Sequence, residues 1–175
     1  INGAVEIKPG ALGPFGAIAG TAVQGSAQMT ADFAATDADM KIGLDGTARL
    51  SGDQPVAKLL GDNAHFALKA QRQGETMTLE SLSIAGKALR ASASGTLKNE
   101  TLDGNWSLAL ADIAPLAPQL AGSVEARGRV GGTLDQASLN ADITARIGTR
   151  AIKPMPVTAT LRLDHLPSAP AGQIT

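Results

Sequence analysis

The sequence predicts an all-β protein in which antiparallel strands form one elongated sheet. Apolar and polar residues alternate with period two in nine segments, and successive side chains of a strand point to opposite faces of its sheet. Short turn sequences separate most of these segments, which is typical of hairpins between antiparallel neighbours. A motif in the middle of the chain also recurs 37 residues later, which indicates a repeated unit.

The clearest strand is 38–51, in which the alternation runs without a break. Met40, Ile42 and Leu44 share one parity, and Lys41 and Asp45 share the other. Because a helix would distribute such charges around its whole circumference, the segment is a strand with one apolar and one polar face. The same alternation predicts strands at 23–33, 64–71, 89–98, 102–110, 124–130, 139–147 and 157–164.

The ninth segment, 77–84, changes parity between Leu79 and Leu82, which predicts a β-bulge. Segments 55–61 and 113–118 break the alternation and are expected to form a helical turn and a Pro-stiffened connector. The terminal ranges 1–20 and 165–175 are expected to be loops or frayed ends. Turns are predicted at 53–55, 73–75, 98–100 and 135–136.

The repeated motif consists of Gly-Thr-Leu, a four-residue spacer and Leu, at 95–102 and again at 132–139. An alternating strand precedes and follows each copy. The unit is therefore expected to be a hairpin, with repeats near 89–122 and 123–164. We expect 1–175 to be a single segment of a longer protein built from such hairpins.

A flat sheet of nine strands would expose far more than the few hundred Å² of contiguous apolar surface that monomers tolerate. We therefore expect an elongated sheet of about 9 to 11 strands, curled into a U-shaped groove with an apolar interior. Small residues occupy many positions of the inner parity, among them Gly25, Ala27, Ala93 and Gly128. They either set a tight curvature or leave room for a ligand, and sequence alone favours neither explanation.

Composition excludes several functional classes. The chain has 15 basic and 16 acidic residues, and aromatic residues make up 2%, so it lacks the positive field and stacking side chains that nucleic-acid binding uses. No apolar run approaches the roughly 18 residues of a membrane-spanning helix. The absence of Cys excludes disulfides and thiolate metal sites.

The residues that usually carry catalysis are scattered. His65 and His165 lie a hundred residues apart, and both are expected at the surface or in a loop. No serine motif and no phosphate-binding loop is present, so we expect no catalytic residue, no cofactor and no enzymatic activity. Four acidic residues follow strand spacing without a calcium loop, which predicts a solvated face and no metal site: Asp32, Asp37, Asp39 and Asp45.

Four consecutive patterns between residues 89 and 134 point to a known family. They read Leu89-x-Ala-x-Ala-x-Gly-Thr-Leu97, Leu102-x-Gly-x-Trp-x-Leu-x-Leu110, Ala111-Asp-Ile-Ala-Pro-Leu-Ala-Pro118 and Gly122-x-Val-x-Ala-x-Gly-x-Val-Gly-Gly-Thr-Leu134. In this order they resemble the TamB family, the inner-membrane subunit of the bacterial translocation and assembly module. That family belongs to the AsmA-like, bridge-type lipid transfer proteins.

The resemblance implies a β-taco-like groove in the periplasm of a Gram-negative bacterium, within a parent protein anchored in the inner membrane. It implies that the groove binds and conducts the acyl chains of phospholipids, or other apolar chains, between the inner and outer membranes. It also implies a TamA-like outer-membrane assembly barrel as a partner of the parent protein. An alternative function is an assembly chaperone for outer-membrane or autotransporter β-strands. The resemblance transfers no catalytic residue.

The large residues of the inner parity are the expected lining of the groove. Trp106 is either a core residue that plugs the groove or a contact for the ligand. An outer-membrane barrel or surface solenoid is a third interpretation, but the chain lacks the aromatic girdles of such a barrel. The predicted lining is Val23, Met29, Phe33, Met40, Ile42, Leu44, Phe66, Leu68, Leu89, Trp106, Leu108, Leu110, Val124, Val130, Ile143, Ile147, Leu161 and Leu163.

Overall fold

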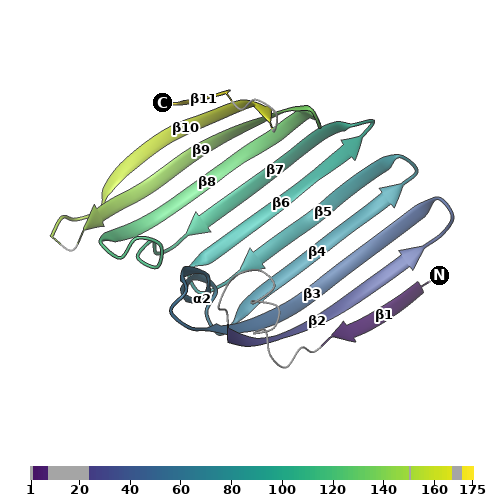
Figure 1. The fold of residues 1–175 in the computed structure, drawn as a ribbon, viewed down its shortest axis with the longest axis horizontal. Coiled ribbons are helices and arrows are strands. Elements are labelled where there is room, and N and C mark those ends of the chain that lie inside the picture. Colours follow the sequence, from purple (N-terminus) through teal and green to yellow (C-terminus); the bar gives the residue numbers. More distant parts are fainter. Residues whose placement is uncertain (1, 8–23, 150, 167–170) are drawn as a thin grey trace.

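The computed structural model describes residues 2–7, 24–149, 151–166 and 171–175. Its eleven described strands form one antiparallel sheet, and one short helix lies at its margin (Figure 1). The strands are β1 (Asn2–Ile7), β2 (Gln24–Ala35), β3 (Asp39–Ser51), β4 (Ala64–Gln73), β5 (Thr76–Ala85), β6 (Leu89–Lys98), β7 (Thr101–Leu110), β8 (Leu120–Thr133), β9 (Gln136–Thr149), β10 (Met155–Leu166) and β11 (Ala171–Ile174). Helix α2 (Pro55–Leu60) joins β3 to β4.

The sheet is a simple meander, in which the strands follow their order in the chain. The nine strands predicted from alternation are confirmed as β2 to β10, and the helical turn at 55–61 is confirmed as α2. Local turn chemistry explains the connections. Asn99 and Glu100, between β6 and β7, have φ values of 49° and 63°, the left-handed pair of a two-residue hairpin turn that matches strand twist.

The predicted bulge in β5 is confirmed. Leu79 lies opposite Gly95 of β6 and Leu82 lies opposite Ala93, so two residues of β5 face one residue of its partner. Glu80 is the extra residue in the β4–β5 ladder. The insertion restores the parity, because it returns Leu79 and Leu82 to the same face of the sheet.

The prediction of loops throughout the terminal ranges is wrong at two places. Strand β1 lies within 1–20 and pairs with β2, and strand β11 lies within 165–175 and pairs with β10. Both are short, and each pairs with a longer neighbour, which supports a strand too short to be stable by local propensity alone. Residues 8–20 and 167–170 lie outside the described residues.

The two copies of the repeat place their side chains on the same faces of the sheet, but the turn lies at a different position in each copy. In the first copy Leu97 pairs with Leu102 and the turn falls at residues 99 and 100. In the second copy Leu134 itself lies in the turn and is half-exposed. The last pair of residues before this turn is Thr133 with Gln136. Relative to the motif, the turn has moved by two residues. An even shift leaves every side chain on its original face, so the sheet tolerates it.

The sheet is open and uncurled, so the structure does not confirm a U-shaped groove with an apolar interior. The accessible surface of 11412 Å² exceeds the roughly 8,000 Å² expected for a compact monomer of this mass. Fully buried residues are few, and most of those that are buried and apolar are Ala. The reason is architectural: the described residues form no second layer against the sheet, so most side chains are covered only by their lateral neighbours.

Candidate functional site

The strand register gathers the predicted lining residues on one side of the sheet, which we call the apolar face. Val23, one of the eighteen, lies outside the described residues. Antiparallel partners point to the same side, so the register assigns each of the others to a face. All seventeen fall on the apolar face: Met29, Phe33, Met40, Ile42, Leu44, Phe66, Leu68, Leu89, Trp106, Leu108, Leu110, Val124, Val130, Ile143, Ile147, Leu161 and Leu163.

The apolar face is continuous from one edge of the sheet to the other. One row of paired positions crosses all eleven strands without a polar residue. Its members are Val5, Ala31, Leu44, Leu68, Leu82, Ala93, Trp106, Gly128, Ala141, Leu161 and Ile174. An apolar chain laid perpendicular to the strands would therefore meet only apolar side chains and glycine along this row.

Several residues of the apolar face were not among the lining residues predicted from the sequence. Val5 and Ile174 lie in the terminal ranges that were expected to be loops, and Leu79 and Leu82 flank the bulge. The alternation of Gly3, Val5 and Ile7 was a usable signal for β1. No comparable signal was present for β11, which has four residues.

The apolar face is open. Phe33 is 40% exposed, Met77 52% and Val157 47%, although all three lie on this face. Large apolar side chains at such exposure form a contiguous surface, the kind that marks an interaction site in a soluble domain. The face can thus bind apolar groups by area alone, at about 25 cal/mol per Å² of surface removed from water.

Small residues on the apolar face make room for large neighbours. A Cβ atom at Gly3 would clash with the ring of its partner Phe33, and one at Gly46 would clash with the ring of its partner Phe66. At these two positions the space above the glycine is filled by an aromatic ring from the next strand, as in the aromatic rescue of glycine. The glycines at these two positions therefore leave no empty volume for a ligand, because the aromatic rings fill it.

Trp106 lies on the apolar face in the middle of the sheet, half-buried. Its cross-strand partners are the small residues Ala93 and Gly128. The indole Nε1 is buried and has no hydrogen-bond partner among the described residues. A buried donor without an acceptor costs about 1–3 kcal/mol, and the cross-strand partners of Trp106 carry no polar side chain that could accept from this N–H.

One rim of the apolar face is covered. Helix α2 and the connector after β7 lie at the same ends of the strands, where Leu59, Ala88, Leu110 and Ile113 form a buried cluster. Hydrogen bonds between backbone groups hold this arrangement in place. In one of them, the amide of Ala88 donates to the carbonyl of Leu59 at 2.8 Å. We call this side the covered rim. The opposite side, where the β4–β5, β6–β7 and β8–β9 hairpins turn, is the hairpin rim (Figure 1).

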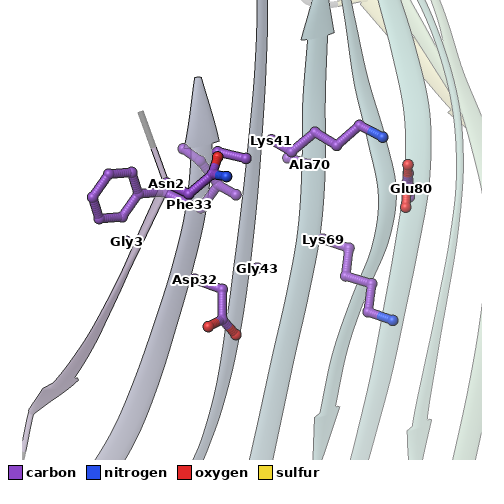
Figure 2. Close-up of a pocket in the computed structure, with 11 residues that line it drawn as sticks. Asn2, Gly3, Asp32, Phe33, Lys41, Gly43, Lys69, Ala70 and Glu80 are labelled. Atoms are coloured by element: carbon purple, nitrogen blue, oxygen red, sulfur yellow. The ribbon is translucent and has the colours of Figure 1, made fainter. Parts of the chain in front are cut away.

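The hollows of the structure include two on the opposite, polar face. One of about 600 Å³ surrounds Gly43, whose cross-strand neighbours are Asp32 and Lys69. Figure 2 shows the ring of Phe33 pointing to one side of the sheet, and Lys41 and Lys69 pointing to the other. The hollow forms because Gly43 has no side chain between its longer neighbours.

The second hollow, of about 670 Å³, has a floor of short side chains that includes Ser92 and Ser107, whose hydroxyls lie 2.8 Å apart. Charged residues flank it: Arg90, Glu125, Arg127 and Asp142. The polar face also carries exposed ion pairs, such as Arg129 Nη2 with Asp103 Oδ1 at 3.1 Å. Such exposed pairs contribute little to stability.

Within the described residues, no helix has the length and apolar character needed to cross a membrane, and no three His, Cys, Asp or Glu side chains gather as metal ligands. His65 lies exposed on the polar face, with Nε2 at 3.2 Å from Asp45 Oδ2. Comparison with protein-family models, with curated proteins and with solved structures finds no match for this chain. The apolar face is therefore the feature from which a function must be argued.

Proposed function

We propose that this chain is a segment of a β-groove protein that binds and conducts phospholipid acyl chains along its apolar face. The observation that carries the proposal is the unbroken, open apolar row across eleven strands. A surface of this kind stabilises acyl chains by about 0.8 kcal/mol for each methylene that leaves water. In the parent protein, further curling of the sheet would produce the U-shaped groove that encloses such chains.

The resemblance to the TamB family supports the biological setting. We propose a periplasmic location between the inner and outer membranes, within a parent protein anchored in the inner membrane and working with a TamA-like outer-membrane barrel. Continuity of the apolar face matters to this setting, because conduction requires that a chain can move without crossing a polar barrier. We propose no enzymatic activity for the segment.

The proposal predicts that a charge on the apolar face blocks lipid binding. In Leu108→Asp, an acyl chain at this point of the face would have to desolvate a carboxylate, so we expect about a tenfold or larger loss of fluorescent phospholipid bound from vesicles. Asn105→Asp, which adds the same charge to the polar face of the same strand, is the matched control and should bind normally.

A second variant separates a loss of binding from a loss of folding. Val157→Asp places the charge where the side chain is already 47% exposed, and circular dichroism checks that the strands persist. Folded Leu108→Asp and Val157→Asp variants that bind phospholipid as well as the parent chain would refute an acyl-chain site on this face.

A chaperone for unfolded β-strands is the second candidate. Among the described strands β1 and β11 each pair with one neighbour, so each presents main-chain groups to which an extended segment could add. Photocrosslinkers at Leu44 and Val130, both on the apolar face, distinguish the two functions. Crosslinks to acyl chains support conduction, and crosslinks to polypeptide support the chaperone.

A further inference from the structure

Arg72 is an exception on the apolar face. Its cross-strand partners are Met40 of β3 and Met77 of β5, both members of that face. Leaving aside the bulges in β5 and β10, the other positions that the described strands contribute to this face are apolar residues or Gly. The exception is Thr149, at the end of β9. Outside those two bulges, Arg72 is therefore the one charged residue that the described strands place on the apolar face.

The side chain of Arg72 is held in place but not neutralised. It is exposed, and its Nε donates to the carbonyl of Gly74 at 2.9 Å, which ties the guanidinium to the β4–β5 turn. The ion pairs among the described residues do not include Arg72. A guanidinium has five N–H donors in a planar fork, so its two terminal nitrogens still offer donors in a fixed orientation.

The surroundings of Arg72 combine a charge with an apolar floor. Met40 and Met77, on either side, are 40% and 52% exposed and carry no charge. The next row inward consists of Ile42, Ala70 and Leu79. Arg72 lies at the hairpin rim, whereas the opposite rim is covered by the apolar cluster around α2.

We propose that Arg72 binds the anionic group, a carboxylate or a phosphate, of an amphiphile whose apolar chain lies on the apolar face. This inference rests on the proposed function and adds the class of ligand and its orientation. The anionic group sits at the hairpin rim, where it stays in contact with water, and the chain extends toward the covered rim. Guanidinium suits both groups because its fork donates two parallel hydrogen bonds to either.

The test compares an acid with its uncharged counterpart. The probes are a fluorophore-labelled dodecanoate, its methyl ester and, as a competitor, dodecyl phosphate. In low salt we expect the wild-type chain to bind the acid about threefold more tightly than the ester, the scale of one exposed ion pair. Because Arg72 is exposed, a Debye length of about 3 Å at 1 M salt should largely remove this preference.

Two variants decide the role of Arg72. Arg72→Gln should bind acid and ester equally, with its affinity for the ester unchanged. Arg49→Gln, which removes the same charge from an exposed position on the polar face of β3, should keep the threefold preference. Competition by dodecyl phosphate in both variants identifies the source of the ligand, since the anion that loses more affinity in Arg72→Gln is the better match.

The outcomes separate this inference from the proposed function. Equal binding of acid and ester by the wild-type chain, or a preference that survives in Arg72→Gln, overturns the role of Arg72 while leaving acyl-chain binding intact. Failure to bind either acid or ester contradicts the proposed function, and the inference falls with it.

Discussion

At the scale of single residues, glycine and aromatic residues act as pairs on the apolar face. The ring of Phe66 lies over Gly46, and a Cβ atom on this glycine would also approach the carbonyl oxygen of Gln28 to 2.8 Å. Gly43, on the same strand, points to the polar face, where a Cβ atom would be 3.9 Å from Asp32 Cβ. The two glycines thus have the same backbone setting and opposite steric surroundings.

This difference predicts opposite effects of the same substitution. Gly46→Ala should lower the free energy of unfolding by about 1–3 kcal/mol, because the methyl group overpacks against Phe66 and the backbone. Gly43→Ala is the control and should be neutral or stabilising by up to about 1 kcal/mol, because it restricts the unfolded chain. Urea unfolding followed by Trp106 fluorescence measures both. Equal destabilisation by the two variants would show that Phe66 does not fill the space over Gly46.

At the scale of elements, one side chain, that of Leu59, anchors helix α2 to the sheet. The helix has six residues, too few to be stable alone, so packing must hold it in place. Leu59 is 7% exposed and packs in the cluster with Ala88, Leu110 and Ile113, whereas Val56 on the same helix is 40% exposed. The covered rim therefore depends on Leu59.

We expect Leu59→Ala to lower the free energy of unfolding by about 2–4 kcal/mol, because it leaves a cavity in the buried cluster. Val56→Ala, on the same helix, should cost less than about 1 kcal/mol. Urea unfolding of the two variants provides the comparison. Similar losses would mean that α2 is not anchored through Leu59 and that the covered rim is not a fixed part of the fold.

At the scale of the whole molecule, the described residues place eleven strands in a single layer and cover its apolar face only at the rim around Leu59. A compact domain would hide such a surface between layers. The large accessible area and the scarcity of fully buried residues have the same cause. The folded chain should consequently behave as an apolar surface toward small dyes.

We expect the native chain to bind the dye anilinonaphthalene sulfonate, with fluorescence that falls when urea unfolds the sheet. Most folded proteins bind little of this dye, and a molten globule binds it without a cooperative transition. A cooperative loss of circular dichroism that coincides with loss of dye therefore identifies a native open face. An absence of dye fluorescence before unfolding would indicate that the apolar face is covered in solution.

The sequence by itself determined the faces of the strands. The alternation around Leu44 or Leu108 settles which side chains share a face, because the two-residue period is a property of the extended backbone. The bulge at Leu79 and Leu82 was equally local, since one inserted residue reverses the parity. Nine of the eleven strands followed from this period alone.

Only the tertiary structure decided what depends on contacts between strands. It revealed the pairing of β1 and β11, the openness of the sheet, the cover around Leu59 and the position of Arg72 among methionines. Strand pairing at an edge and curvature arise from the sum of many weak cross-strand contacts, which no local pattern records. Alternation therefore fixed the face on which a side chain lies, and the tertiary contacts fixed what covers that face.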